Sequence, residues 1–370
     1  CFTKGCDFLM TVPQPSAEEI ARRLSEAMRG ALDLFSVYIG DQLGFYRLLV
    51  SGGPATSMQL AERAGTNERY TREWLEQQAV TGFLAVDDPT KPVTERVFSL
   101  PAGYEAVFVD PDSFIGMAQG AQILVGTVKP LPALLEAFRT GAGVPYDAYG
   151  PDLAGGQARF NRPMLLHQLA QDYIPVMPDI DARLRADPPA RVADIGMGMA
   201  WSSIGLARGY PKITVDGFDL DAYSVEQANA NVAAEGLRDR VVCHCRDAGD
   251  PELAGQYDFA LAVECVHDMA NPVAVLSAMR RLVGPGGTVL IVDDRADESF
   301  LPNGTDQERV LYGFSILHCL PVGMGDSTSA QTGAVMRPDT FRGYAAEAGF
   351  SKVEILPVEH EGFSFYRLTA

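Results

Sequence analysis

A short glycine-bearing stretch, DIGMGMA at residues 194–200, has residue types and spacing that could bind a charged ligand. Gly196 and Gly198 permit a tight turn that brings a ligand close to bare backbone. The helix expected to begin at Trp201 offers unpaired N–H groups beside that turn. Asp194 lies on the strand itself, where a carboxylate would pair with a ligand's ammonium group. A nicotinamide-binding fingerprint needs a small residue where Trp201 stands, so a dehydrogenase is disfavoured.

The elements that must position this stretch form an alternating pattern after residue 189. Five apolar or β-branched runs alternate with helix-length segments: RVADIG, KITVDGFD, RVVCHC, YDFALAVE and GTVLIVDD. The alternation predicts an α/β fold with a parallel, doubly wound sheet, whose carboxyl edge receives ligands. The final runs, KVEILPV and FSFYRLTA, are separated only by EHEG. Because this gap is too short for a helical crossover, we expect an antiparallel hairpin.

A helix-turn-helix pattern lies nearer the beginning of the chain. Residues 57–64 and 67–81 predict two helices separated by a glycine turn. The runs FLAV and RVFSL then flank a proline-bearing loop, as in a β-hairpin wing. We therefore predict a winged-helix domain at residues 16–101. A helical connector at 102–189 and the sheet-bearing domain at 190–370 follow it.

Residues 190–370 resemble a class I S-adenosylmethionine-dependent methyltransferase. The first-strand motif of that family is [D/E]-x-G-x-G-x-G. Asp194, Gly196 and Gly198 match it, and Ala200 replaces the third glycine. The resemblance implies a Rossmann-like seven-stranded sheet, S-adenosylmethionine as cofactor, and a loop packed against its methionine part. With its winged helix, the chain is similar to bacterial winged-helix methyltransferases of uncharacterised substrate and to small-molecule O-methyltransferases.

The resemblance implies further cofactor contacts. Asp219, at the end of ITVDGFD, would accept hydrogen bonds from the ribose diol, with Leu220 flanking the adenine. Asp221 is the competing acid, and we expect it to cap the next helix instead. Asp247 would accept a hydrogen bond from the adenine amino group, and the N–H of Ala248 would meet a ring nitrogen. The alternative for Asp247 is that it caps its own loop.

His267 and Asp268, just past YDFALAVE, resemble the pair at this place in winged-helix O-methyltransferases, where the histidine removes the acceptor hydroxyl proton. A neutral imidazole can take a proton near pH 7 and contribute about 10²–10⁴-fold to the rate. The alternative is that His267 caps a helix or bonds backbone. Met269 replaces the family's usual aromatic residue, which leaves the acceptor type open. Glu264 could contact cofactor or acceptor, or place its charge at a helix N-terminus.

Side chains outside the strands are candidates for the acceptor pocket, because linker helices close over the substrate in the related enzymes. The alternative for each is a structural role. The candidates are Tyr146, Tyr149, Arg159 and Asn161 of the connector, and His318 in the insertion between the fifth and sixth strands. We expect no metal site, since Cys243 and Cys245 share one strand face and His244 lies on the other. The cysteines that lie in apolar stretches are expected to be reduced core residues: Cys243, Cys245, Cys265 and Cys319.

The charge balance disfavours a nucleic-acid partner. Lysine plus arginine total 30 against 48 for aspartate plus glutamate, a net charge of -18 that repels polyanions. The second helix of the helix-turn-helix sums to −1, from Arg69 and Arg72 against Glu68, Glu73 and Glu76. The apolar run ALDLFSVYIGDQLGFYRLL has more hydrophobic surface than a three-helix module can bury. This predicts a homodimer.

No run of about 18 uncharged apolar residues suggests a membrane span, and the first residues do not resemble a secretory leader. The sequence thus predicts a cytoplasmic methyltransferase acting on a small molecule, with oxygen as the expected target atom. Two alternatives stay open. One is a transcriptional regulator that senses S-adenosylmethionine, and the other is a non-catalytic cofactor-binding protein.

Overall fold

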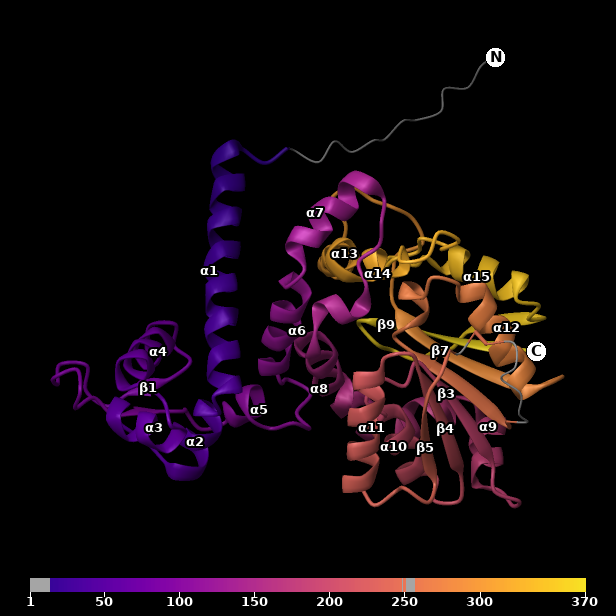
Figure 1. The fold of residues 1–370 in the computed structure, drawn as a ribbon, viewed down its shortest axis with the longest axis horizontal. Helices are drawn as coiled ribbons and strands as arrows, with labels where there is room; N and C mark the ends of the chain where they lie inside the picture. The colour runs from indigo at the N-terminus through magenta and orange to yellow at the C-terminus, as the bar shows by residue number, and fades with distance from the viewer. Residues whose placement is uncertain (1–13, 248, 251–256) are drawn as a thin grey trace, which may run out of the picture. The chain divides into compact units, whose positions relative to one another are not determined.

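The computed structural model describes residues 14–247, 249–250 and 257–370. They divide into two compact units, one ending at Glu105 and one beginning at Ala106 (Figure 1). Within the described residues, no helix has both the length and the apolar character needed to cross a bilayer.

The first unit is a winged helix, as predicted. Its elements are α1 (Ala17–Gln42), α2 (Phe45–Gly52), α3 (Ser57–Ala64), α4 (Glu68–Val80) and the antiparallel pair β1 (Ala85–Val86) and β2 (Phe98–Ser99). Thr56 and Gln59 form a capping box on α3, and the side chain of Asn67 caps α4. Gly65 ends α3 in the left-handed conformation, which makes the turn between these helices.

Residues 106–189 of the connector belong to the same compact unit as the sheet, and residues 102–105, with the first residue of α5 (Glu105–Phe108), belong to the first unit. The connector continues with α6 (Ala118–Val128), α7 (Leu131–Thr140), η1 (Tyr146–Tyr149), α8 (Pro151–His167), η2 (Leu169–Tyr173), η3 (Ile174–Val176) and α9 (Pro178–Arg185). Helices α6 and α8 pack closely through glycines. A Cβ at Gly126 would lie 2.3 Å from the backbone nitrogen of Leu153. A residue without a side chain is therefore needed where these two helices approach each other.

Seven strands form one sheet in the order β5-β4-β3-β6-β7-β9-β8. They are β3 (Arg191–Ile195), β4 (Thr214–Asp219), β5 (Val241–Cys245), β6 (Phe259–Val263), β7 (Thr288–Asp294), β8 (Lys352–Ile355) and β9 (Phe363–Thr369). The first five pair in parallel, and β9 runs antiparallel to both β7 and β8. The predicted doubly wound sheet and terminal hairpin are therefore confirmed.

Helices cover both faces of the sheet (Figure 1). On one side lie α10 (Trp201–Gly209) and α11 (Ala222–Ala234), and on the other lie α12 (Pro272–Val283) and α15 (Pro338–Glu347). Each face of the sheet has its own hydrophobic core, and successive side chains of a strand point into one core and then the other. Val192 of β3 packs into the core of α10 and α11, while Ala193 and Ile195 pack into that of α12 and α15.

The carboxyl ends of β3, β4, β6 and β7 meet at one edge of the sheet because these strands are parallel. The chain crosses from β5 over to β6 between the two halves of the sheet, and open α/β sheets bind ligands at such a switch point. After β6 comes the short η4 (Val266–Asp268). After β7 come α13 (Asp306–Phe314), the π-helical η5 (Ser315–Cys319) and α14 (Leu320–Gly323).

The expectation that the cysteines lie in the core is wrong for Cys245. Cys319 is buried, Cys243 and Cys265 are half-buried, and Cys245 is exposed. The reason is topological, because β5 is an edge strand and Cys245 is its last residue. His244, on the opposite face, contacts Asp216 with 3.1 Å between Nε2 and Oδ1.

Candidate functional site

The glycine-bearing loop after β3 adopts backbone angles that favour glycine. Gly196 has φ 67° and Gly198 has φ 53°, and Ala200 adopts the same left-handed region at φ 66° just before α10. A Cβ at Gly196 would lie 2.6 Å from Cys265 Sγ, whereas Gly198 has open space around it. The loop therefore stays close to β6 at one glycine and presents bare backbone at the other.

Gly196→Ala is expected to destabilise the protein more than Gly198→Ala. Both changes force alanine into the left-handed region, which costs about 1–2 kcal/mol, but only the first also meets Cys265. Urea unfolding of the two variants measures the difference, with Gly198→Ala as the matched control. Equal losses in the two variants would contradict this packing of the loop on Cys265.

Asp194 is buried, and its Oδ2 accepts hydrogen bonds of 2.6 Å from the hydroxyls of Ser202 and Ser203 at the start of α10. Alternation along β3 places Asp194 on the α10 side of the sheet. Burial raises the pKa of Asp194 to about 6, although the two serine hydroxyls act in the opposite direction. Its carboxylate ties the strand to the helix, and its contact with a ligand ammonium stays a prediction.

Asp219 lies directly beside the glycine loop. Its two carboxylate oxygens accept hydrogen bonds from the N–H groups of Gly198 (2.8 Å) and Asp221 (2.9 Å). Burial raises the pKa of Asp219. Asp221 caps α11, because its carboxylate accepts from the N–H of Ser224 at 2.8 Å. The prediction that Asp221 caps this helix is therefore confirmed. Leu220, between these two acids in the chain, is 69% exposed, so a flat apolar part of a ligand could contact its side chain.

Asp247 uses its carboxylate within its own turn, where Oδ1 accepts from the N–H of Gly249 at 2.7 Å. The structure therefore contains the loop-capping bond that was the alternative for this residue, and the adenine contact stays a prediction. Ala248 lies outside the described residues.

Glu264 takes up a conformation rare for a side-chain-bearing residue, with φ 53° directly after β6. Its N–H donates to the carbonyl of Val292 at 2.7 Å, and its Oε2 accepts from Nδ2 of Asn161 on α8. Burial, followed by the charge of Asp294, raises the pKa of Glu264. Backbone strain held in place by neighbours is often found at functional sites. Asn161 is thus brought to the sheet edge, and its place in an acceptor pocket stays a prediction.

His267 is buried with 4% exposure, and its Nδ1 lies 2.5 Å from Oδ1 of Asp293. A carboxylate can only accept, so Nδ1 carries a proton whether the ring is neutral or charged, and in the neutral ring Nε2 is the proton acceptor. Asp293 is fully buried and also accepts from the N–H of Val266 at 3.1 Å. The alternative that His267 caps a helix is not realised, because Asn271 caps α12.

Burial alone would lower the pKa of His267, but the charge of Asp293 raises it well above 6.5. Burial also raises the pKa of Asp268 to about 6 and raises the pKa of Asp294. His267, Asp293 and Asp294 each place one possible metal-ligand atom within 4.8 Å of the others. The 2.5 Å hydrogen bond already joins two of these three side chains.

The acceptor candidates fall into two groups. His318 in η5 contacts the rings of Tyr146 and Tyr149, with centroids 5.7 and 4.8 Å away, and both tyrosines pack in one apolar cluster with Leu317 of η5 and Val322 of α14. Arg159 instead turns toward α6, where Nη1 donates to Gln122 Oε1 at 2.7 Å.

Sequence reasoning missed Asp293 and Asp294, whose carboxylates face His267. The signal was present, because the run GTVLIVDD places two acids where a parallel strand reaches the carboxyl edge. Cys319, which the sequence placed beside His318 in the same insertion, has its Sγ 3.5 Å from His318 Nδ1.

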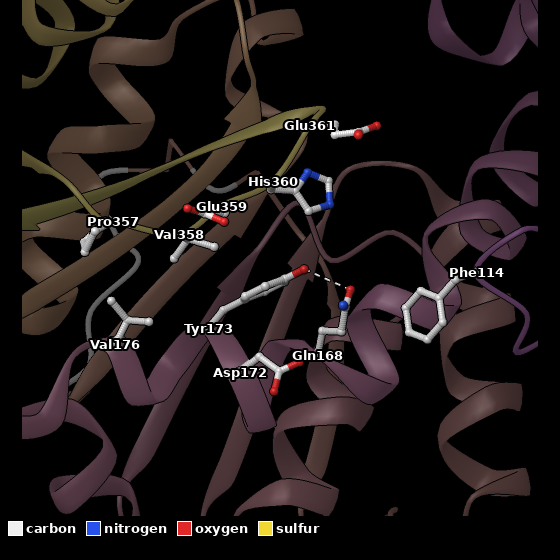
Figure 2. Close-up of a pocket in the computed structure, with 10 residues that line it drawn as sticks. All are labelled: Phe114, Gln168, Asp172, Tyr173, Val176, Pro357, Val358, Glu359, His360 and Glu361. Atoms are coloured by element: carbon white, nitrogen blue, oxygen red, sulfur yellow. Dashed lines mark hydrogen bonds between the residues drawn. The ribbon is translucent and has the colours of Figure 1, made fainter.

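A separate open pocket of about 630 Å³ lies between η2 and the loop that joins β8 to β9 (Figure 2). Figure 2 shows the Tyr173 hydroxyl donating to Oε1 of Gln168, a bond of 2.9 Å, with Phe114 nearby. The lining of this pocket includes the carboxylates of Asp172, Glu359 and Glu361. It includes none of the predicted site residues. This pocket is therefore distinct from the cluster around His267.

Comparison with known proteins agrees with this geometry. Residues 192–287 match the family model described as a methyltransferase domain. Residues 30–108 match the Rv2258c-like winged helix-turn-helix domain. The chain thus carries a class I S-adenosylmethionine-dependent methyltransferase domain behind a winged helix-turn-helix domain.

Individual relatives resemble parts of the chain or its fold. Methyltransferase GfsG of Streptomyces halstedii is 32% identical over 112 residues, which cover 30% of this chain and 40% of that protein. Among solved structures, human N-acetylserotonin methyltransferase in complex with S-adenosylmethionine has a TM-score of 0.68 at 15% identity, covering 96% of this chain and 99% of that one. Mitomycin 7-O-methyltransferase MmcR has a TM-score of 0.66 at 18% identity, covering 95% and 98%. Because these sequence identities are low, the likeness to the two solved structures shows that the fold is shared and nothing more.

The residues at the sheet edge fit S-adenosylmethionine. Bare backbone at Gly198, the carboxylate of Asp219 and the exposed Leu220 suit a nucleoside. The buried carboxyls beyond β6 and β7 suit a cation, because burial makes their own ionisation unfavourable and a sulfonium would offset that cost.

Proposed function

We propose that this protein is a cytoplasmic S-adenosylmethionine-dependent methyltransferase that methylates an oxygen of a small molecule, with His267 as general base. The observation that carries the proposal is the buried His267–Asp293 pair at the sheet edge that also carries the glycine loop. Incubation with labelled S-adenosylmethionine and a library of phenols, carboxylic acids and amines tests it. Gain of the labelled methyl by a phenol supports the proposal, and gain only by amines contradicts it.

The protein's own residues do three things in this reaction. Gly196, Gly198 and Asp219 hold the cofactor, which supplies an electrophilic methyl group on a sulfonium when bound. Asp293 holds His267 in the tautomer that leaves Nε2 free to take the acceptor's proton. The imidazolium that then forms is stabilised by the Asp293 carboxylate.

The dependence of kcat on pH follows from the raised pKa of His267. Only the neutral imidazole can accept a proton, so kcat is expected to rise with pH through that pKa. In Asp293→Asn the charge that raises the pKa of His267 is gone, while burial still lowers that pKa. The increase of kcat is therefore expected at lower pH, and the maximal kcat is expected to be smaller. Steady-state rates of both proteins across acid, neutral and alkaline pH measure the shift. A rise at unchanged pH would contradict the assigned pairing.

We also infer that the protein forms a homodimer through α1. Apolar side chains that recur every three or four residues share one face of this helix, and that face is exposed. Leu24, Met28 and Leu32 are 67%, 60% and 59% exposed. A second copy of the same chain would bury this stripe, because in a two-fold symmetric dimer the same surface of each subunit contacts the other.

The double change of Leu24 and Leu32 to Glu is expected to halve the mass measured by light scattering at micromolar protein. Burying carboxylates in an apolar contact is unfavourable. Arg22→Glu is the control, because Arg22 is exposed, pairs with Glu26 and lies off the stripe. A dimer that persists in the double variant would overturn this interface.

No observation favours the regulator alternative. The exposed charges of α4 include an ion pair between Arg69 and Glu73, which leaves no cationic stripe of the kind DNA phosphates require.

A further inference from the structure

His318 has a buried nitrogen with no protein partner. The side chain is 2% exposed, and within the described residues its Nε2 has no hydrogen bond. Its other nitrogen, Nδ1, faces Cys319 Sγ at 3.5 Å. Buried polar atoms are almost always hydrogen-bonded, so an exception calls for an explanation such as a ligand. His318 also lies in a π-helical segment, and such segments are frequent at functional sites.

Two tyrosines hold the imidazole ring of His318 in place. Tyr149 meets it edge-on, with ring centroids 4.8 Å apart at 89°, and is itself anchored by a 2.8 Å hydrogen bond from its hydroxyl to the carbonyl of Leu317. Tyr146 contacts it at 5.7 Å and 62°. The nitrogen is therefore presented in a fixed direction by an aromatic wall.

This wall lies near the segment that carries the proposed base, because α14, which directly follows η5, contacts η4: a Cβ at Gly323 would lie 3.2 Å from the carbonyl oxygen of Asp268. Burial lowers the pKa of His318 to about 3, and the charge of His267 acts in the same direction. Burial raises the pKa of Tyr146, and the charges of Asp268 and Asp219 add to that effect. Both side chains are thus close enough to the reaction site to respond to its charges.

The protonation of His318 determines which kind of group it can bind. The ring is neutral, and burial raises the pKa of the Cys319 thiol, so that thiol keeps its proton. Sγ of Cys319 lies 3.5 Å from Nδ1, and when the protonated thiol donates to Nδ1, the proton of the neutral ring is on Nε2. Nε2–H is then a donor for a carbonyl or ether oxygen.

The surrounding charges exclude anionic ligands. Four buried carboxyls lie around His267, namely Glu264, Asp268, Asp293 and Asp294. Burial raises the pKa of Glu264, Asp268 and Asp294, so each of these carboxyls is harder to ionise than a free one. A carboxylate or phosphate on the acceptor would add a further negative charge to a buried site that already disfavours ionised carboxyls.

We propose that Nε2 of His318 donates a hydrogen bond to an oxygen next to the reacting hydroxyl, so that the acceptors are uncharged aromatic hydroxyl compounds carrying a neighbouring carbonyl. This inference rests on the proposed function, and it names the acceptor class of that same site.

Binding of three matched probes to the full chain saturated with S-adenosylhomocysteine tests the inference. The probes are 2-hydroxyacetophenone, phenol and salicylate, followed by calorimetry and by NMR of ¹⁵N-labelled histidine. The ketone is expected to bind at least about tenfold more tightly than either other probe and to shift the His318 ring nitrogens. Equal or tighter binding of salicylate, or failure of all three probes to bind, overturns the proposal.

Two His318 variants separate hydrogen bonding from packing. His318→Phe keeps the ring contacts and is expected to lose the preference for the ketone over phenol. His318→Gln keeps a donor and is expected to regain part of it. Unchanged preference in His318→Phe overturns the proposal. Binding of S-adenosylhomocysteine is measured first and separately, so loss of cofactor binding, which would defeat the proposed function, is distinguishable from loss of acceptor selectivity.

Discussion

His267→Ala is expected to lower kcat by about 10²–10⁴-fold, the usual contribution of a positioned general base. The rate falls because alanine cannot accept the proton that Nε2 of His267 would take. Asp293 then has no imidazole to orient. Cofactor affinity is expected to change little, since Asp219 and the glycine loop lie on β4 and β3. Methyl transfer to the best phenol of the library and calorimetry with S-adenosylmethionine measure the two quantities.

Two further variants make the loss of rate interpretable. His267→Asn keeps an N–H donor for Asp293 and so limits the cost of a buried, unpaired carboxylate. It is expected to be folded and nearly as slow as His267→Ala. His167→Ala is the matched control, because His167 is exposed at the end of α8 and outside the cluster. Full activity of both His267 variants would favour the non-catalytic alternative or a different base.

Asp219→Ala is expected to weaken S-adenosylmethionine binding by about 10–100-fold. A hydrogen bond to a charged group is worth about 1.5–3 kcal/mol, and every 1.4 kcal/mol is tenfold in affinity. The same carboxylate also holds the N–H of Gly198, so its loss loosens the glycine loop as well. Calorimetric titration of the variant gives the change directly.

Asp221→Ala is the control for this titration. Asp221 is two residues away and caps α11, so its loss is expected to lower the free energy of unfolding by about 1 kcal/mol with little effect on affinity. If Asp221→Ala weakened binding more than Asp219→Ala, the assignment of the ribose contact to Asp219 would be wrong.

The order of elements was predictable from the sequence. Strand-length apolar runs and their spacing predicted the parallel sheet, and the four-residue gap EHEG predicted the antiparallel hairpin, because a crossover helix does not fit in it. Glycines at 196 and 198 predicted the turn, since few other residues adopt positive φ without strain. These are local properties of the chain, so local patterns carry them.

The pairings inside the site depended on the tertiary structure. Asp293 follows His267 by 26 residues, and Asn161 precedes Glu264 by 103, so their contacts arise only when β6, β7 and α8 come together. The direction of Asp194 was likewise decided by which face of the sheet α10 covers. The sequence by itself determined the fold class and the edge at which chemistry occurs. Packing decided which buried groups share protons and charges there, because hydrogen bonding and desolvation depend on neighbours that are distant in the chain.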